Sequence, residues 1–474
     1  MIPVVTVTQM RRADEAQIAV LDQHGHGQHG HAVLVERAGA AVAFAALRML
    51  SGAYGKRVVV IAGKGSNGAD GKVAARRLAD RGAAVEVIAA DVAADEVVDS
   101  QRADLVIDAA YGTGFRGTWE PPLVFGVPVL AVDVPSGLDA DVGTCAGDVL
   151  RADRTITFAA LKVGHLMNDG PQVCGDIEIA DIGVDVVDHC DDVATYLVEP
   201  TDVAAWIPPR NRDAHKWSHA VRVIAGGGGM TGAAALVCAA AMRAGAGIVH
   251  ASMRDSSVES SNALPTEVVQ RHLTSGHWGA QVAADAHRFA ALVIGPGLGR
   301  GDDVSELVRD VVRSVSIPVV VDGDGLAAVV DAHGDSSSLT TRTAPTVLTP
   351  HDGEFASLGG DVHAVDKISA TRQLAERMGC VVLRKGPTTI VTSPDGPTFL
   401  VASGDQRLAT AGSGDVLSGV IAAFLSRGMD AAPAATAAAV VHGVAASLCS
   451  TEGTIARDVV GEIAHVLAEM CGPQ

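Results

Sequence analysis

The sequence predicts an α/β protein of two domains, each built on a largely parallel β-sheet. The chain has 474 residues, more than a single hydrophobic core usually supports. Short apolar runs alternate with helical patterns along both halves, as in strand–helix–strand units. Aromatic residues make up only 3% of the chain, so the core must consist of Ala, Val, Leu and Ile, which suits strands buried on both faces.

The first half contains a series of predicted strands, at residues 58–62, 85–89, 105–108, 129–132 and 155–158. Between the first two strands, residues 71–80 (GKVAARRLAD) have apolar side chains at helical spacing. Gly82 follows at the position where a glycine would end a helix. This alternation predicts a doubly wound parallel sheet.

A break in the pattern marks the expected domain boundary. Residues 199–217 contain Pro208, Pro209 and clustered charges, and the alternation resumes after them. We therefore expect one domain over residues 1–205 and a second over residues 206–474. The second-half strands are predicted at residues 221–225, 291–294, 318–321, 346–348 and 380–383.

Composition narrows the possible partners. The net charge is −19, from 36 basic and 55 acidic residues, which argues against nucleic acid or an anionic membrane as the main partner. Backbone N–H groups can still bind a nucleotide locally. The seven cysteines form no C-x-x-C pair and indicate free thiols in a reducing cytoplasm. The N-terminus lacks a signal-peptide pattern, and no run of about 18 apolar residues occurs. We expect a cytoplasmic homo-oligomer that acts on small molecules.

The second half contains a candidate phosphoryl-transfer site. Residues 407–414 (RLATAGSG) precede Asp415 and a segment whose apolar residues recur at helical spacing, so the glycines stand at a helix N-terminus. Free N–H groups and the helix dipole stabilise phosphate charge there. Asp415 could accept a proton from a substrate hydroxyl as that hydroxyl attacks phosphorus. The alternative is that Asp415 only caps the helix. Further glycine turns after predicted strands, at residues 225–229, 294–299 and 385–389, favour the catalytic interpretation.

A second candidate site lies in the first half. Residues 63–71 (GKGSNGADG) follow a predicted strand and open a helix, where doubly wound folds bind phosphates. Asp108 and Asp133 each end another strand. Because parallel strands end at one edge of a sheet, Asn67, Asp70, Asp108, Asp133 and Ser136 can meet there. Such oxygen donors suit a cation and one general base. The alternatives are a glycine turn without ligand, and aspartates that only cap the turns after their strands.

The second half resembles the ADP/ATP-dependent NAD(P)H-hydrate dehydratases, which have a ribokinase-like α/β sandwich fold. The resemblance covers about residue 206 to the C-terminus and rests on HKWSHAVRVIAGGGGMTGA, IGPGLG, VVVDGDGL, LTPHDGE, KGPTT and AGSGD. It implies that Asp415 is the catalytic base and that Mg²⁺ and ADP are required. The implied nucleotide-binding residues are Lys385, Gly386, Pro387, Thr388, Thr389, Gly412, Ser413 and Gly414, of which the last three form the anion hole. The implied contacts to the hydrated nicotinamide nucleotide are Ala233, Gly297, His351 and Asp415.

The first half resembles the NAD(P)H-hydrate epimerase domain, which has a Rossmann-like fold. The resemblance runs from about residue 33 to 183 and also includes VERAG, LKVGH and ADIG. It implies that Asn67, Asp108 and Ser136 hold a potassium ion and that Asp133 is the acid–base residue. The implied substrate-binding residues are Ser66, Asn67, Gly68, Ala69, Asp70, Gly112, Thr113, Gly114, Phe115, Arg116, Gly117, Thr118 and Asp133.

The chain departs from the family patterns at several positions. Ser66 and Ala69 replace Asn and Gly in the usual GNNGGDG, Ser413 replaces a common Thr, and Asp352 stands where Pro is usual. Gly323 and Gly325 loosen a DAD-like turn. A single His at position 351 is more often a hydrogen-bonded loop residue, but Glu354 nearby and the family resemblance together favour a binding role over an acid–base role. Residues 22–31 carry four histidines, which we interpret as an exposed loop insertion and not a metal site.

Together the two halves predict a nicotinamide nucleotide repair enzyme. One domain would interconvert the R and S hydrates, and the other would dehydrate the S form at the expense of ADP, giving NAD(P)H, AMP and phosphate. One alternative is an ATP-dependent kinase of vitamin precursors on the same fold, which would leave the first domain without a role. The other is a nucleotide-binding protein whose N-terminal domain is inactive, as the Ser66 and Ala69 replacements could allow.

Overall fold

The computed structural model describes residues 1–24, 29–227, 229–254, 263–273, 278–330 and 333–472. The chain divides into two compact units, one of residues 2–195 and one of residues 196–474 together with Met1. The expected boundary lay between residues 205 and 206. Helix α7 (Pro200–Trp206), just before it, packs against helices α17 and α18 of the second unit.

The first unit contains a six-stranded sheet whose strands are all parallel, in the order β10-β8-β7-β5-β2-β3. Its strands are β2 (Arg57–Ala62), β3 (Ala84–Ala89), β5 (Leu105–Ala109), β7 (Val129–Val132), β8 (Arg154–Phe158) and β10 (Asp176–Ala180). The chain passes from β2 to β3 on one side and later to β5 on the other. A topological switch point therefore lies between the carboxyl ends of β2 and β5.

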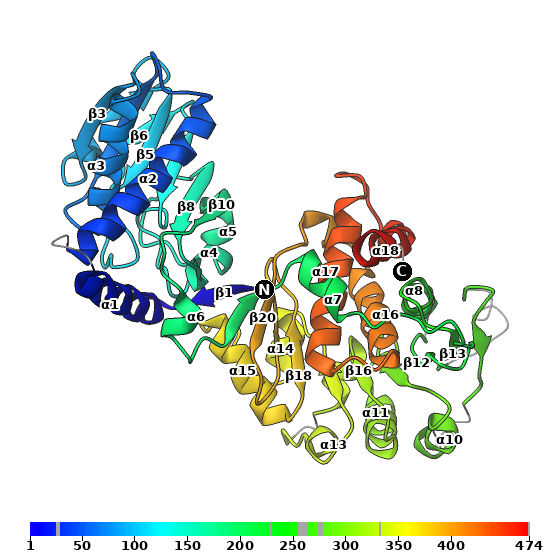
Figure 1. Cartoon of the computed structure of the whole chain (residues 1–474). Coiled ribbons are helices and arrows are strands. Elements are labelled where there is room, and N and C mark those ends of the chain that lie inside the picture. Colours follow the sequence, from blue (N-terminus) through cyan, green and yellow to red (C-terminus); the bar gives the residue numbers. More distant parts are fainter. Residues whose placement is uncertain (25–28, 228, 255–262, 274–277, 331–332, 473–474) are drawn as a thin grey trace. The chain divides into compact units, whose positions relative to one another are not determined.

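Smaller elements complete the first unit. Two parallel pairs lie outside the sheet, β1 (Ile2–Val5) with β9 (Leu161–Lys162) and β4 (Val97–Asp99) with β6 (Leu123–Phe125). The helices are α1 (Val7–His24), α2 (Gly30–Leu50), α3 (Ser66–Ala79), α4 (Val163–Leu166), α5 (Gly170–Val173) and α6 (Val186–His189), with a 3₁₀ turn at Ala93–Asp95. Helices α2 and α3 pack against each other and against the sheet (Figure 1).

The second unit is a layered sandwich around one large sheet. Strands β14 to β18 of the order β14-β13-β12-β15-β16-β17-β18-β19-β20 are parallel, and the last three pair in antiparallel fashion. These strands are β12 (Ala220–Ile224), β13 (Ile248–Ser252), β14 (Val269–Gln270), β15 (Ala291–Ile294), β16 (Val319–Val321), β17 (Thr346–Leu348), β18 (Val381–Arg384), β19 (Thr389–Thr392) and β20 (Thr398–Val401). Strand β11 (Thr195–Leu197) lies at the division between the units.

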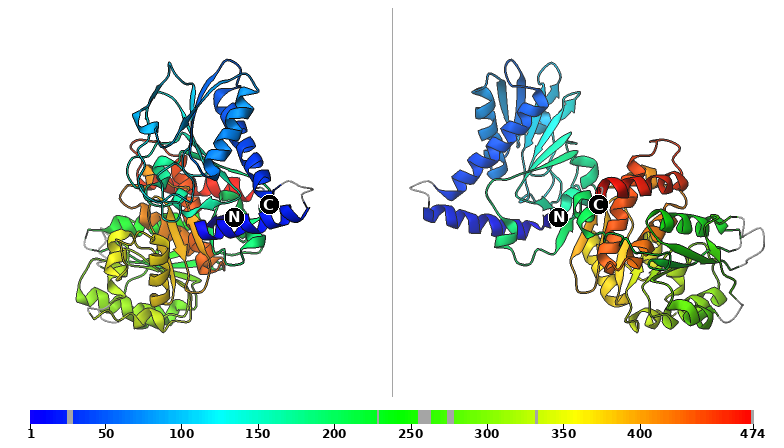
Figure 2. Two further views of the ribbon diagram at one scale, coloured as in Figure 1. Left: turned by 90° about the vertical axis from the view of Figure 1, so that its left-hand side faces the viewer. Right: turned by 45° about the vertical axis from the view of Figure 1, so that its right-hand side comes forward.

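Helices cover both faces of this sheet (Figures 1 and 2). One apolar core includes residues of α8 (Thr231–Arg243), α16 (Ser413–Ser426), α17 (Ala431–Ser447) and α18 (Ala456–Cys471). The core of the other face includes residues of α10 (Trp278–Ala286), α11 (Asp302–Ser314), α12 (Asp324–Ala328), α13 (Ser337–Thr340), α14 (Asp352–Ser357) and α15 (Lys367–Met378). A 3₁₀ turn at Gln406–Leu408 precedes α16. The predicted α/β architecture of two domains is confirmed.

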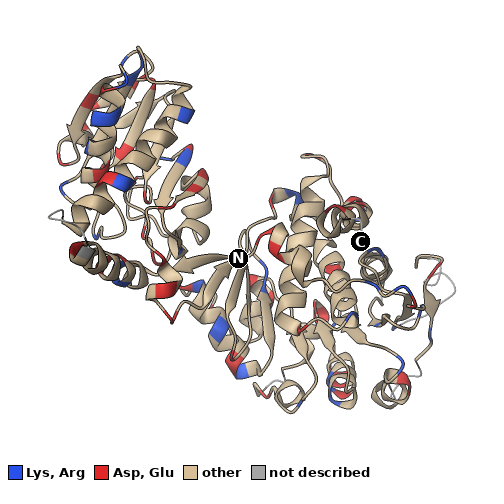
Figure 3. Cartoon of the chain, in the orientation of Figure 1, with Lys and Arg blue, Asp and Glu red and all other residues tan. Residues whose placement is uncertain are grey.

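Charged residues are distributed over both units, and the cysteines form no disulfides. Acidic and basic residues are interspersed along the ribbon of the described chain (Figure 3). All seven cysteines are unpaired. Of the helices that the structure describes, none has the length and apolar character needed to cross a bilayer.

Candidate active sites

The second-unit site is built at the N-terminus of α16. Gly412 occupies the N-cap position with a φ of 89°, a left-handed conformation that favours glycine, and Asp415 stands in the first helical turn. Asp415 is therefore not the cap of its helix. Its side chain is half-buried. The sequence-predicted base consequently lies at the electropositive end of a helix and is not covered by packed side chains.

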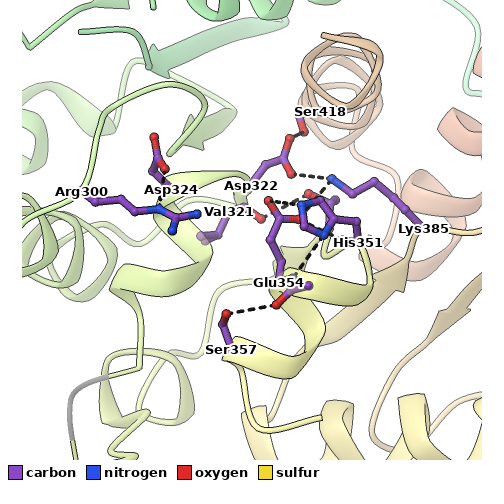
Figure 4. A network of polar contacts seen from close by, with 11 residues as sticks. Arg300, Val321, Asp322, Asp324, His351, Glu354, Ser357, Lys385 and Ser418 are labelled. Carbon is purple, nitrogen blue, oxygen red and sulfur yellow. Dashed lines mark hydrogen bonds and ion pairs between the residues drawn. The ribbon is translucent and has the colours of Figure 1, made fainter. Parts of the chain in front are cut away.

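Asp322, Glu354 and Lys385 form a salt-bridged network (Figure 4), and their charges act on Asp415. The Lys385 Nζ is 3.0 Å from the Asp322 Oδ1 and 3.5 Å from the Glu354 Oε2. Ser418, one helical turn after Asp415, donates a hydrogen bond of 2.7 Å to the Asp322 Oδ2. The segments that follow β16, β17 and β18 thus contribute an aspartate, a glutamate of helix α14 and a lysine to one cluster.

Burial and the charges of this network together set the pKa of Asp415. Burial raises the pKa of Asp415 to about 7, and the neighbouring Asp322 carboxylate acts in the same direction, whereas Lys385 opposes it. Burial alone would also raise the pKa of Asp322, but Lys385 and a hydrogen bond from Ser418 hold that pKa below its ordinary value. At neutral pH, Asp415 therefore exchanges protons readily while Asp322 stays ionised, the division of roles that proton-transfer sites require.

Glycines allow close approach around this acid. A Cβ at Gly414 would lie 3.3 Å from the Lys385 Nζ, so a side chain there would crowd the ammonium group. Gly297 has a φ of 60°, and a Cβ there would lie 3.0 Å from the Ala233 Cβ, which places these two predicted substrate contacts side by side. Their loop is joined to the neighbouring turn because the Gly299 N–H donates a hydrogen bond of 2.9 Å to the Asp324 Oδ2.

His351 and Lys385 occupy adjoining positions in this site. The Lys385 N–H donates a 2.9 Å hydrogen bond to the Pro350 carbonyl oxygen. The His351 imidazole accepts from the Glu354 N–H at 3.2 Å, and the Glu354 carboxylate accepts from the His351 N–H at 2.9 Å, so the two residues form a capping box at α14. Beyond Lys385, Gly386 and Pro387 are exposed, whereas Thr388 is buried and Thr389 is half-buried in β19.

Asp352, which replaces the family's usual Pro, has a partner in the structure. The Arg384 Nε donates a 2.9 Å hydrogen bond to the Asp352 Oδ1, and the Arg384 guanidinium stacks on the Phe355 ring at 4.2 Å. The Ser413 hydroxyl donates a 2.7 Å hydrogen bond to the Leu408 carbonyl oxygen, so it fixes the turn before α16.

The first-unit site is a cavity of about 730 Å³ at the topological switch point. Of the predicted substrate-binding residues, the following line it: Ser66, Asn67, Asp70, Gly112, Thr113, Gly114, Phe115, Arg116 and Asp133. Gly68, Ala69, Gly117 and Thr118 do not line this cavity. A Cβ at Gly68 would lie 2.0 Å from the Gly63 carbonyl oxygen, so Gly68 serves close packing.

Asp133 has a constrained geometry at the end of β7. Its φ of 67° is a left-handed conformation that non-glycine residues rarely adopt, a frequent feature of functional positions. Its Oδ1 accepts hydrogen bonds from the Lys162 Nζ at 2.7 Å and the Thr157 hydroxyl at 3.0 Å. Burial alone would raise the pKa of Asp133, but Lys162, His165 and Thr157 together hold that pKa below its ordinary value. The His165 Nε2 lies 2.8 Å from the Asp133 carbonyl oxygen.

Asp108 and Ser136 form a buried pair beside Asp133. The Ser136 hydroxyl donates a 2.6 Å hydrogen bond to the Asp108 Oδ1, and the Ser136 N–H donates one of 2.9 Å to the Oδ2. Asp108 also accepts from the Ala110 N–H at 3.3 Å, so it does fix the turn after its strand. Burial raises the pKa of Asp108 despite these bonds. A Cβ at Gly112 would lie 3.2 Å from the Asn67 Cγ and 3.3 Å from the Asp133 Oδ2.

Asn67, Asp108 and Ser136 carry the kinds of oxygen atom that bind a cation. An amide oxygen, a carboxylate and a hydroxyl are the hard oxygen donors that a potassium ion accepts. The Asn67 Nδ2 is buried and has no hydrogen-bond partner among the described residues. The positions of the amide oxygen and nitrogen can therefore be exchanged, so that the oxygen faces a ligand. These residues fit the cation. Within the described ranges, no cluster of three or more His, Cys, Asp or Glu side chains is arranged to hold a metal ion by itself.

Several residues of both sites were missed by the sequence analysis. Lys162 and Asp14 line the first-unit cavity, and Asp322 and Ser418 organise the second site. The histidine-rich segment also differs from the expected loop: its residues 25–28 lie outside the described part of the chain, but His31 belongs to α2, lines the cavity and lies 3.3 Å from the Ser66 hydroxyl. The spacing of Ser418 three residues after Asp415 was the one local signal available.

Comparison with known proteins gives matches to both units. Residues 221–465 match the family model described as NAD(P)H-hydrate dehydratase, and residues 31–99 and 89–164 match the YjeF-related protein N-terminus. The Salinibacter ruber bifunctional NAD(P)H-hydrate repair enzyme Nnr is 34% identical, over 99% of this chain and 97% of that relative. The enzyme of that name from Mycobacterium leprae is 36% identical, over 89% and 90%. A crystallised ribokinase-like superfamily protein from Enterococcus faecalis has 20% identity and a TM-score of 0.51, and the match covers 59% of this chain and 98% of that one, which shows the ribokinase-like fold.

Proposed function

The chain belongs to the family of bifunctional NAD(P)H-hydrate repair enzymes, and we propose that each of its two domains performs one step of that repair. The second domain dehydrates the S form of hydrated NADH or NADPH at the expense of ADP. The first domain interconverts the R and S hydrates, so that neither form accumulates. The observation that carries the dehydratase proposal is Asp415, which is accessible at a helix N-terminus and has a pKa of about 7.

Dehydration begins with a phosphoryl transfer. Asp415 accepts the proton of the hydroxyl on C6 of the hydrated ring, and the hydroxyl oxygen attacks the terminal phosphorus of ADP, which releases AMP. The N–H groups at Gly412, Ser413 and Gly414 stabilise the transferring phosphate. Phosphate then departs from C6 as the lone pair of the ring nitrogen forms a double bond to C6, and loss of a proton from C5 to solvent forms the C5=C6 double bond of NAD(P)H. Phosphate is a far better leaving group than hydroxide, which is why ADP is consumed.

The remaining residues bind and orient the two substrates. Lys385 to Thr389 contact the nucleotide, and the Lys385 ammonium exchanges part of its pairing with Asp322 and Glu354 for the phosphates. Ala233, Gly297 and His351 contact the hydrated nucleotide. Asp324 and Glu354, whose charges act on Asp415, would supply carboxylate oxygens to Mg²⁺ alongside phosphate oxygens. When bound, Mg²⁺ neutralises charge on the phosphates.

In the first domain, Asp133 is the acid–base residue. Lys162 keeps its carboxylate ionised and occupies its Oδ1, so the Oδ2 is directed toward Gly112 and available to substrate. The loops 66–70 and 112–118 hold the substrate over this carboxylate. Asn67, Asp108 and Ser136 would hold a potassium ion, which supplies positive charge beside the anionic substrate when bound. Cytoplasmic location and homo-oligomeric assembly are part of this proposal as well; sedimentation velocity tests the second.

The dehydratase is tested by the loss of hydrate absorbance when ADP and Mg²⁺ are added to the S hydrate. Wild type and Glu452→Gln, which removes an exposed acid of the second domain, should deplete the hydrate, and Asp415→Ala should not. A vitamin-precursor kinase would phosphorylate a different acceptor with ATP and leave the hydrate unchanged. A binding protein would leave it unchanged with all three chains.

The epimerase is tested separately with the R hydrate and excess dehydratase. After spontaneous epimerisation is subtracted, wild type should deplete the R form and Asp133→Ala should not. If Asp133→Ala depletes the R form as fast as wild type, the assignment of Asp133 as the acid–base residue is wrong.

A further inference from the structure

Helix α1 forms one wall of the first-domain cavity. Its cavity-lining residues are Val7, Met10, Arg11, Asp14 and Ile18, which are spaced so that they share one helical face. The family model of the first domain begins at residue 31, so this helix lies outside the matched segment. The wall is apolar except for Arg11 and Asp14, which means that these two side chains are the polar groups that α1 presents to a ligand.

Other contacts fix α1 in the first unit. The Val7 N–H at its start donates a 2.7 Å hydrogen bond to the Asp141 Oδ1. On the face away from the cavity, the Arg12 guanidinium forms an ion pair of 2.5 Å with Asp192. Because α1 is anchored at its start and along its back, the position of Asp14 toward the cavity is set by the fold.

The Asp14 carboxyl has no structural partner to explain its burial. Among the described residues, no hydrogen bond or ion pair of this carboxyl is observed, although the side chain is half-buried. A half-buried acid without a partner costs stability, so a purely structural role does not account for it. The position suits a group whose partner is the ligand.

The cavity that Asp14 lines holds several other ionisable side chains, which are Asp70, Asp133, Lys64, Lys162, Arg11, Arg116 and His31. Burial raises the pKa of Asp14 to about 6. The charges of Asp133 and Glu15 also raise this pKa, whereas those of Lys162 and His31 lower it. Asp70, on α3, has its pKa raised to about 8 by burial and by the charges of Asp133 and Asp14. The Lys162 ammonium pairs directly with Asp133 and offsets the charge of that carboxylate, whereas the Lys64 ammonium pairs with Asp91. Asp70 therefore retains its proton near neutral pH, whereas Asp14 has both its acid and its ionised form populated around pH 6.

We propose that Asp14 is the second acid–base residue of epimerisation and works opposite Asp133. The proposal rests on the epimerase function proposed above. The cavity then holds an ionised carboxylate and a carboxylic acid together, the combination that exchanges protons with two atoms of one substrate.

The hydrate is a carbinolamine, so the two residues can open and close its ring without another reactant. Asp133 takes the proton of the C6 hydroxyl, the C6–N1 bond breaks with its electron pair moving to N1, and C6 becomes an aldehyde carbon. Asp14, in its acid form, gives its proton to N1. Rotation about the C5–C6 bond turns the other carbonyl face to N1. On closure N1 attacks C6, the N1 proton returns to Asp14, and the proton on Asp133 returns to oxygen, which regenerates both groups.

The test uses the full chain carrying Asp14→Asn, with Glu15→Gln as the matched control. Glu15 is the adjacent exposed acid on the same helix and does not line the cavity. Epimerisation of the R hydrate is measured with the dehydratase domain of the same chain, whose turnover of the S hydrate reports whether the chain is folded. We expect kcat for epimerisation to fall by about 10²-fold or more in Asp14→Asn, since acid–base groups contribute roughly 10²–10⁴-fold. KM should stay within about threefold, and Glu15→Gln should match wild type.

The pH profile separates proton transfer from a packing effect. Because the acid form of Asp14 is required, kcat/KM of wild type should decline as pH rises above about 6, and this decline should be absent in Asp14→Asn. Asp14→Glu, which keeps a carboxyl group, should restore part of the activity if Asp14→Asn disturbs the helix.

Each other outcome overturns the proposal. Wild-type kcat in Asp14→Asn, a change in KM alone, an unaltered pH profile, or failure of Asp14→Glu to exceed Asp14→Asn would each exclude Asp14 from proton transfer. If wild type itself does not epimerise the R hydrate above the spontaneous rate, the proposed epimerase function fails instead, and the two failures are distinguishable.

Discussion

Replacing Asp415 by Asn should abolish dehydration and stabilise the second domain. The amide keeps the size of the side chain and its hydrogen-bonding capacity but cannot accept the substrate proton. Because a general base contributes roughly 10²–10⁴-fold, kcat should fall by that factor while KM for the hydrate changes little. In wild type, kcat/KM should rise with pH through about 7, since only ionised Asp415 can act as a base.

The stability gain follows from the same pKa. Folding raises the pKa of Asp415 from 3.8 to about 7, so ionisation disfavours the folded state. The stability that this group contributes is complete below pH 3.8 and is lost as the pH rises through about 7. At about 1.36 kcal/mol per pH unit, the loss reaches up to about 4 kcal/mol at pH 8. Asn does not titrate, so Asp415→Asn should exceed wild type in stability by a margin that increases between pH 5 and pH 8.

Urea unfolding followed by circular dichroism at several pH values measures this margin, with Glu452→Gln as a control that should follow wild type. Substantial dehydratase activity in Asp415→Asn would refute its role as the base. A margin that does not grow with pH would refute the reasoning that burial beside Asp322 raises its pKa.

Three further changes probe the two sites. Lys162→Met removes the cation paired with Asp133, so burial then raises the pKa of that carboxyl. Epimerase activity should therefore fall at neutral pH and recover toward higher pH. Turnover of the S hydrate by the second domain should not change. Gly414→Ala places a Cβ about 3.3 Å from the Lys385 Nζ, so KM for ADP should rise several-fold, and an unchanged KM would argue against a phosphate position over this turn. Exchange of potassium for a bulky organic cation should lower epimerase activity only, and loss of both activities would point to a general salt effect.

The sequence predicted the sheets more fully than the sites. The strands at residues 129–132, 291–294 and 346–348 have the predicted bounds, because short β-branched runs buried on both faces leave a clear pattern. Helix α1 was not predicted. Its cavity-facing positions include Arg11 and Asp14, so the apolar stripe that would reveal an amphipathic helix is interrupted by the polar groups that face the ligand space.

The residues of the candidate sites also fall into two groups, those that a local sequence pattern identifies and those that it does not. Asp415 and Asp133 could be identified because a glycine turn or a strand end precedes them. The residues that surround them could not, because Ser418 bonds to Asp322 across 96 residues and Lys162 bonds to Asp133 across 29. Such pairs depend on how strands are ordered in a sheet, which local patterns do not encode. The pKa values that give each acid its role depend on those pairs.

The presence of two separately packed units on one chain has a consequence for the cell. Every ribosome that completes this polypeptide delivers one epimerising site and one dehydrating site, so their numbers are equal whatever the level of gene expression. The balance between the two steps is then decided by the turnover rates of the sites alone. Selection on the residues around Asp14, Asp133 and Asp415 is therefore the means by which the flux through the two steps can be matched.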